Sequence, residues 1–149
     1  MTAEHEVPRG DAVPAVRRVI HVPSVLSCAA EITRIKRRLR GRGLDATLRW
    51  VRKRVDGVAC NEDFPIDVVR AVEHRIALAG ALYPARALCL EQSLALYCLL
   101  RRQGVAVRYR TGVQPFPFVA HAWVEYRGEV INDVAEHVKW FAPLPEPLP

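Results

Sequence analysis

The stretch LCLEQSLALYCLL, residues 88–100, predicts a buried helix around which the rest of the fold is organised. Its apolar side chains recur with the spacing of a core-facing helix, at Leu90, Leu94, Tyr97 and Cys98. The pair Tyr83-Pro84 breaks the helix that comes before it. Cys89 is therefore expected in the first turn, among backbone N–H groups that lack an intrahelical partner and favour a thiolate. An isolated cysteine on an apolar helix is more often a packing residue, so both readings of Cys89 stay open here.

Three further helices are predicted before this stretch. The first is capped by Ser24, runs through Leu39 and is ended by Gly41 and Gly43. The second covers about 45–54, and the third runs from Ile66 to Leu82. The polar face of the first helix is expected to carry a set of basic residues, Arg34, Lys36, Arg37, Arg38 and Arg40.

After Gly104 the pattern changes from a helical period to alternation, which predicts strands. We expect strands at 105–113, 119–126 and 130–133, with a tight turn at Arg127-Gly128 between the last two. The proline-rich tail, residues 143–149, is expected to be extended and without regular structure. Helices followed by an antiparallel sheet make an α+β fold. We expect one domain over 1–149, with a basic helical part (1–80), a core that carries the candidate site (81–140) and the tail (141–149).

Composition narrows the class of protein. Half of the 149 residues are hydrophobic and 26% are charged, which is typical of a globular protein of one domain. We find no transmembrane stretch and no signal peptide, so we expect a cytoplasmic protein with free thiols. Residues 1–56 hold 13 Lys and Arg against 6 Asp and Glu, whereas the remainder is nearly balanced. Arg37 and Arg38 in this basic part are candidates for binding a peptide or partner, and a solvated helix face is the alternative.

A histidine and an acid follow Cys89 in positions where they can meet. A hairpin folded about Arg127-Gly128 pairs residues whose numbers sum to about 254 or 255, which places His121 opposite position 133 or 134. Directly opposite side chains in an antiparallel pair lie about 5 Å apart at Cβ, so Asp133 can reach the His121 ring. A nucleophilic cysteine needs such a base and a group that orients it. Trp123, two residues after His121, is expected either to pack on the sheet, to shield the base from water, or to bind a peptide.

Other chemistries have weaker support. Four residues could ligate zinc, namely Cys89, His121, Asp133 and His137, but they lack the spacing of known zinc motifs, and we predict no metal and no cofactor. Neither a phosphate-binding loop nor a dinucleotide fingerprint occurs. No nucleic-acid-binding module is recognisable, and we expect neither nucleic acid nor membrane as a partner.

The blocks CLEQSLAL (89–96), LLRRQG (99–104) and HAWVE (121–125) resemble those of one family. The chain resembles the transglutaminase-like leader peptidases of lasso-peptide biosynthesis, known as B proteins, over about 80–135. The resemblance implies a transglutaminase-like, papain-like core and a cysteine protease triad, which falls on Cys89, His121 and Asp133. It also implies an oxyanion met by the Cys89 backbone amide, with the second donor unassigned because Gln92 lies one turn further into the helix.

The resemblance further implies a substrate and partners. The substrate would be a ribosomally made precursor, whose leader is cleaved off so that an asparagine-synthetase-like cyclase can close the macrolactam. Because residues 1–80 are predicted as helices without the strands of a leader-binding domain, we expect the split form, served by a separate small leader-recognition protein. Two alternatives remain open, namely an acyl transferase of the transglutaminase type and a non-catalytic scaffold that binds leader and partners.

Overall fold

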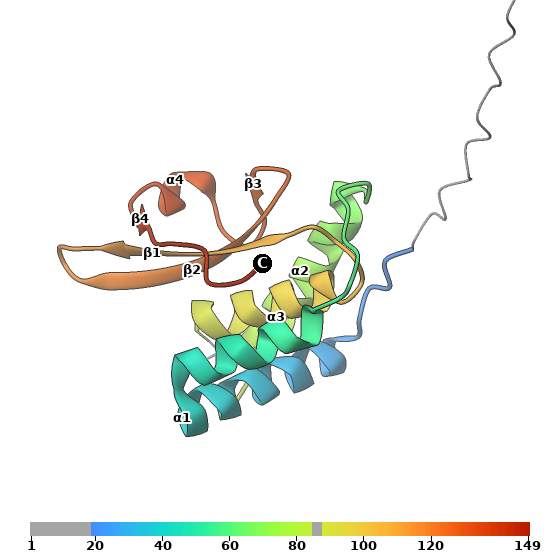
Figure 1. Cartoon of the computed structure of the whole chain (residues 1–149), viewed down its shortest axis with the longest axis horizontal. Coiled ribbons are helices and arrows are strands. Elements are labelled where there is room, and N and C mark those ends of the chain that lie inside the picture. The colour runs from blue at the N-terminus through green and yellow to red at the C-terminus, as the bar shows by residue number, and fades with distance from the viewer. Residues whose placement is uncertain (1–18, 85–87) are drawn as a thin grey trace, which may run out of the picture.

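The computed structural model describes residues 19–84 and 88–149 and has the predicted α+β order. Figure 1 shows α1 (Val25–Val55) and α3 (Cys89–Arg101) on one side of the sheet and the short helix α4 (Ala135–Val138) on the other. We call α1, α2 (Ile66–Leu82) and α3 the helical layer. The four strands, α4 and the segment 131–134 form the sheet side. Part of the predicted helical segment 1–80 lies outside the described residues.

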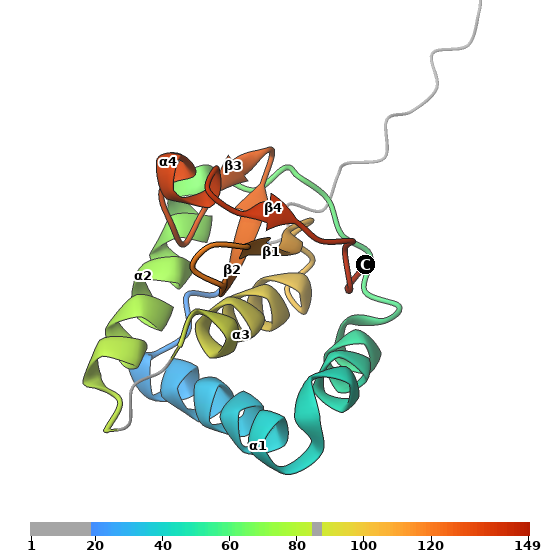
Figure 2. The ribbon, with the colours of Figure 1, turned by 90° about the vertical axis from the view of Figure 1, so that its left-hand side faces the viewer.

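Helix α1 combines the two helices that the sequence predicts. Gly43 has φ 76° and ψ 178°, so the chain turns sharply there, and Figure 2 shows the two halves running in different directions. The buried carboxylate of Glu31 joins the halves, since it pairs with Arg34 and lies 3.5 Å from Arg54 Nη2. Ser24 Oγ accepts from the Ser27 N–H and caps the helix as predicted.

The basic face of α1 differs from the prediction at one position. Lys36 is 7% exposed, and its ammonium group lies 5.2 Å from the centroid of the Tyr83 ring. A lysine can be buried in this way because its long aliphatic stem packs on apolar surface while the cation faces an aromatic ring. Lys36 therefore faces the interior of the helical layer, and the prediction that it lies on the solvated face was wrong.

Helix α3 begins at Cys89 and ends at Arg101, as predicted, and Gly104 follows with φ 87°. It is enclosed by α1, α2 and the sheet. Its fully buried side chains include Leu94, Leu96 and Leu100, and Tyr97 and Tyr109 meet edge to face with their ring centroids 6.1 Å apart. This packing fixes the position of α3 and therefore of Cys89 in its first turn.

The sheet has the order β3-β2-β1-β4 and is antiparallel throughout. Strand β1 spans Arg108–Gln114 and β2 spans Val119–Tyr126, and Gly112 lies opposite His121. The β2–β3 turn at Arg127 and Gly128 has positive φ at both residues, 51° and 78°, as a type I′ hairpin turn requires. The predicted strand at 105–113 begins three residues late, because Val105 forms a bridge with Asn61 instead.

The predicted third strand is shorter than expected. Strand β3 covers only Glu129–Val130, in the predicted register, with Glu125 opposite Val130. Beyond it the Ile131 N–H still donates to the Val124 carbonyl. The Asn132 side chain then takes the place of the backbone, since its Oδ1 accepts from the Val124 N–H at 2.8 Å. The strand prediction for 130–133 was therefore wrong beyond Val130.

The tail is extended, as predicted, but it packs on the domain and includes a short strand. Strand β4, Ala142–Pro143, pairs with β1 at its edge, where a proline is tolerated. Leu148 is 4% exposed, and the Pro149 carbonyl accepts a hydrogen bond from Tyr97. Neither β4 nor α4 was predicted. No helix among residues 19–84 and 88–149 is long and apolar enough to cross a membrane.

Candidate active site

Cys89 is the first residue of α3 and is partly exposed. Its neighbour Leu88 has no side-chain group that could cap the helix, and the buried carboxylate of Glu91 supplies half of a capping box by accepting from the Leu88 N–H at 2.8 Å. The Leu88 amide is therefore occupied. The Cys89 amide follows it at a position where helical N–H groups have no intrahelical acceptor.

A cavity of about 300 Å³ joins Cys89 to the sheet side. It is lined mostly by apolar groups from α1, α3, β1, β2 and the tail, namely Leu44, Leu88, Cys89, Leu90, Thr111, Gly112, Ala120, His121, Ala122 and Leu144. Cys89 and His121 thus line the same cavity. No hydrogen bond joins Cys89 Sγ to the imidazole in the described part of the chain, and catalytic hydrogen bonds in unliganded proteins are often long.

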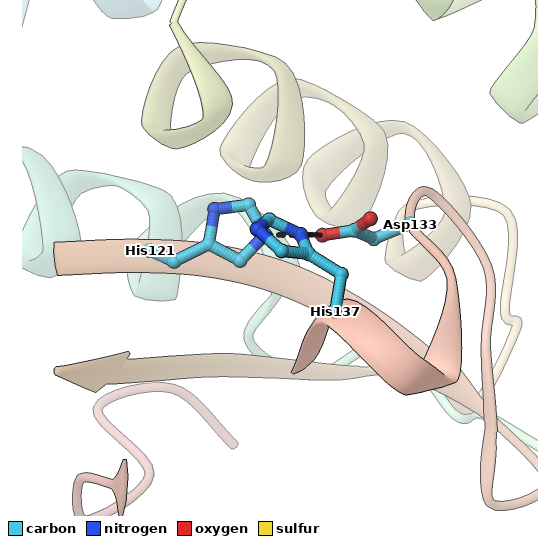
Figure 3. Close-up of side chains that lie close together, drawn as sticks. All are labelled: His121, Asp133 and His137. Atoms are coloured by element: carbon cyan, nitrogen blue, oxygen red, sulfur yellow. Dashed lines mark hydrogen bonds and ion pairs between the residues drawn. The ribbon is translucent and has the colours of Figure 1, made fainter. Parts of the chain in front are cut away.

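His121 lies on β2 and is held at one ring nitrogen. Its Nε2 lies 2.5 Å from Asp133 Oδ2, and both side chains are largely buried, with 14% and 16% exposed. Figure 3 shows the other ring nitrogen, Nδ1, pointing away from Asp133. A carboxylate on Nε2 fixes the tautomer that carries the proton there, so the lone pair of the neutral ring is on Nδ1. The predicted contact between His121 and Asp133 is present.

Asp133 accepts more hydrogen bonds than the sequence indicated. Its Oδ2 also accepts from His137 Nδ1 at 2.7 Å, and its Oδ1 accepts from the Val134 N–H at 2.7 Å. Burial acts to raise the pKa of Asp133. The bonds from His137, the Val134 N–H and His121 outweigh it and hold the pKa below its usual value. Asp133 is therefore an anion at neutral pH.

Aromatic rings surround the His121 imidazole. Trp123 stacks on it with a centroid distance of 5.9 Å and an interplanar angle of 21°, and Phe141 lies 4.9 Å away. Trp123 is only 2% exposed, so it packs on the sheet beside the imidazole, where it also shields the base from water, and its contact with a peptide stays a prediction. A Cβ on Gly112, opposite His121, would come within 2.8 Å of Phe141 Cβ, so only glycine fits beneath these rings.

A pair of polar side chains fastens α3 to the sheet side. Ser93, fully buried and one turn after Cys89, donates to the Ala122 carbonyl at 2.8 Å. Its Oγ accepts from Asn132 Nδ2 at 2.8 Å. Asn132 Oδ1 also accepts from the Val124 N–H of β2. These bonds therefore connect α3 to the residue after His121, which is Ala122, and to the residue before Asp133, which is Asn132. We call Ser93 and Asn132 the clasp.

His121, Asp133 and His137 are a group whose donor atoms could hold a metal ion, since one from each lies within 4.8 Å of the others. Two histidines and a carboxylate fit the donor set of catalytic zinc. Asp133 Oδ2 is already hydrogen-bonded to His121 Nε2 and to His137 Nδ1, and an ion held by these three atoms would have to displace both bonds. Cys89, the fourth residue considered from the sequence, does not belong to this group.

The remaining residues singled out from the sequence lie elsewhere. Arg37 and Arg38 line a shallow groove on α1, and Arg38 stacks over Trp50 at 4.3 Å. Gln92 does not line the cavity and packs against Gly80 of α2, as expected of a residue one turn into the helix. Burial raises the pKa of the Cys98 thiol to about 12, with the Glu31 carboxylate adding to the effect, so Cys98 is a packing residue.

Sequence reasoning missed Ser93 and Asn132 as contributors to the site, and it considered His137 only as a possible zinc ligand and not as a partner of Asp133. His137 comes four positions after Asp133, and Asp133 precedes the N-cap Val134 of α4, so recognising this one-turn helix would have indicated that the two side chains lie close together. Ser93 follows Cys89 by the same spacing. Asn132 carried no signal, because its partners lie on β2 and α3.

Comparison with known protein families gives a match over most of the chain. The model of the transglutaminase-like superfamily core matches residues 33–146, and the chain belongs to this superfamily. The match supports cysteine-dependent chemistry of the protease or acyltransferase type. Comparisons with curated proteins and with solved structures found no match.

Proposed function

We propose that this protein is a cysteine peptidase that removes the leader from a lasso-peptide precursor, with Cys89, His121 and Asp133 as its triad. The observation that carries the proposal is the cavity shared by Cys89 and His121, together with the Asp133 carboxylate on the ring nitrogen remote from the open Nδ1. Membership of the transglutaminase-like superfamily supports the reaction type. The resemblance of residues 80–135 to lasso leader peptidases supports the substrate.

In the first step His121 Nδ1 takes the proton of the Cys89 thiol while Nε2–H stays bonded to Asp133. The imidazolium that forms is stabilised by the Asp133 carboxylate. The thiolate then attacks the carbonyl carbon of the last leader residue. The oxyanion of the tetrahedral intermediate is met by the Cys89 N–H at the start of α3, where the helix dipole also favours negative charge.

Collapse of this intermediate breaks the peptide bond. His121 returns its proton to the leaving amine, which becomes the free N-terminus of the core peptide, and the leader remains as a thioester on Cys89. A water molecule then gives a proton to His121 and attacks the thioester carbonyl carbon. The C–S bond breaks, His121 returns the proton to Cys89 Sγ, and the leader leaves with a carboxylate end. The Leu88 N–H cannot be the second oxyanion donor because Glu91 holds it. We leave that donor unassigned.

The proposal includes partners and a compartment. A separate small protein would capture the leader and deliver it, and an asparagine-synthetase-like cyclase would use the freed amine. All three proteins would act in the cytoplasm. The apolar lining beside Cys89 fits an extended peptide segment more readily than a charged small molecule.

The test is cleavage of the cognate precursor, with its leader-binding protein, in water enriched in oxygen-18. Hydrolysis through a thioester places one heavy oxygen in the new carboxylate of the leader, which mass spectrometry detects. An acyl transferase, the runner-up that superfamily membership also supports, would join the leader to an added primary amine in place of water. Cleavage at another bond, or an amine adduct as the main product, would overturn the peptidase proposal.

A further inference from the structure

One oxygen of Asp133 accepts from two imidazoles. Oδ2 lies 2.5 Å from His121 Nε2 and 2.7 Å from His137 Nδ1, and the two ring centroids are 5.0 Å apart (Figure 3). A triad needs only the first of these bonds, so the second is not explained by the proposed mechanism. An ionised carboxylate oxygen only accepts hydrogen bonds, so both ring nitrogens that contact it carry a proton.

His137 is itself held in place. It lies on α4, which begins two residues after Asp133, and 43% of its side chain is exposed. Its ring meets Phe141 edge to face at 5.3 Å and Trp140 at 6.2 Å. Phe141 also touches His121, so the same aromatic group supports both imidazoles. His137 is therefore a fixed donor and not a surface histidine that meets Asp133 by chance.

We propose that His137 is a positioning residue of the active site, which locks the Asp133 carboxylate so that Oδ2 stays on His121 Nε2. The inference rests on the proposed triad and extends it to a fourth side chain. A carboxylate with one partner can rotate and exchange its two oxygens. With His137 on Oδ2 and the Val134 N–H on Oδ1, that rotation would break two bonds besides the one to His121.

The consequence for catalysis is indirect. His137 contacts neither Cys89 nor the cavity in the described part of the chain. It acts by keeping His121 in the tautomer that leaves the Nδ1 lone pair available to the Cys89 proton. Without it, His121 would spend part of its time with the wrong ring nitrogen protonated or in another orientation, and kcat would fall while KM would change little.

Two substitutions separate the hydrogen bond of His137 from its ring packing. His137→Asn places an amide N–H close to the position of Nδ1 and removes the ring, whereas His137→Phe keeps the ring and removes the donor. Glu136→Gln, an exposed neighbour on α4, is the matched control. Thermal unfolding of each variant shows whether it is folded at the assay temperature.

The readout that does not depend on substrate is the rate at which iodoacetamide alkylates Cys89, followed by peptide-resolved mass spectrometry. We expect this rate, and kcat for the precursor, to fall about tenfold in His137→Phe and less than about threefold in His137→Asn. Equal loss in both variants, or no loss in His137→Phe, would overturn the positioning role. His121→Ala gives the reference: if Cys89 alkylation is unchanged in it, the Cys89–His121 pair fails, and this inference fails with it.

Discussion

In the helical layer, α1, α2 and α3 meet through apolar side chains, whereas on the sheet side the residues of the site are held by hydrogen bonds. Leu94 and Ile76 are nearly or fully buried in the first region. In the second, Asp133 alone accepts three hydrogen bonds. The candidate nucleophile comes from the first region and its base from the second. The site therefore depends on two kinds of force and on the clasp that connects them.

This difference predicts what a substitution in each region should change, either the stability of the domain or the rate of the reaction. Apolar packing is tolerant in direction, so loss of a methyl group in the helical layer lowers stability and shifts Cys89 little. Hydrogen bonds are directional, so loss of one on the sheet side misplaces the imidazole without unfolding the domain. Damage to the helical layer should lower the melting temperature first, and damage to the sheet side should lower kcat first.

The largest effect on the sheet side is expected for Asp133→Asn, which keeps the shape and removes the charge. We expect kcat/KM for the precursor to fall about 10³-fold or more, because the imidazolium loses its counter-charge and the tautomer is no longer fixed. Asp67→Asn, an exposed residue in the first turn of α2, is the control. Activity within tenfold of wild type would remove Asp133 from the triad.

Asp133 should also leave a signature in stability against pH. Its pKa is held below its usual value in the folded protein. Its stabilising contribution is therefore complete above the ordinary carboxyl pKa and is lost as the pH falls through the lowered value. Denaturant unfolding should therefore be measured between about pH 6 and about pH 3, a range that includes the ordinary carboxyl pKa of about 4. In wild type the unfolding free energy should fall toward the acid end of this range. In Asp133→Asn the loss should be smaller, and identical curves for the two proteins would contradict the assignment.

In the helical layer, Leu94→Ala tests the opposite failure. Leu94 is fully buried in α3, and truncation should cost about 2–5 kcal/mol of unfolding free energy. Below the new melting temperature kcat should stay within about threefold of wild type, since the directional bonds of the sheet side remain. Leu82→Ala, at a position 69% exposed, should change neither the unfolding free energy nor kcat. A large loss of kcat in folded Leu94→Ala would mean that the two regions do not fail separately.

A substitution in the clasp should lower both the unfolding free energy and kcat, each by a smaller amount. Ser93→Ala removes the bond to the Ala122 carbonyl and the acceptor of Asn132 Nδ2, which should cost about 1–3 kcal/mol. Because Asn132 precedes Asp133 directly, kcat should fall by about threefold to tenfold as well. Ser27→Ala serves as the comparison in urea unfolding and in the cleavage assay, because it removes an exposed hydroxyl that is bonded only locally, to Ser24 Oγ at the start of α1. A change in stability alone would limit the clasp to folding.

The smallest effect concerns Arg37 and Arg38, which lie in the helical layer away from the cavity. Their joint replacement by Gln should weaken binding of the precursor or its carrier protein at low salt, and salt should erase the difference, because exposed charges are screened beyond about 10 Å at 0.1 M. The double variant Arg40→Gln, Arg49→Gln removes the same charge from two exposed positions of α1. Equal affinities for the two variants at every ionic strength would make Arg37 and Arg38 part of a solvated face.

Sequence reasoning succeeded where local pattern determines structure. The extents of α2, α3 and β2, the break at Gly43 and the hairpin register all follow from periodicity, glycine and turn chemistry. It failed where a side chain finds a distant partner. Lys36 faces Tyr83, Asn132 replaces a strand residue, and His137 joins Asp133 because a one-turn helix too short to show a period places it there.

The candidate site divides in the same way. The contact between His121 and Asp133 was predicted from the β2–β3 turn, and the two side chains do meet at 2.5 Å. Asp133 lies three residues beyond β3, however, so it meets His121 from the segment that follows the strand and not as a paired strand residue. The approach of Cys89 to His121 is tertiary and became visible only as a shared cavity. The roles of Ser93 and His137 needed the contacts of α3 and α4 with the sheet.

The proposed mechanism depends most directly on Cys89 as the nucleophile. The decisive measurement is cleavage of the cognate precursor by wild type and by Cys89→Ala, with the leader-binding protein present and the products followed by mass spectrometry. Loss of a nucleophile typically lowers kcat by about 10⁴-fold or more, so we predict no detectable free leader with Cys89→Ala. Cleavage at a rate comparable to wild type in that variant would contradict the mechanism and leave Cys89 as a packing residue of the cavity wall.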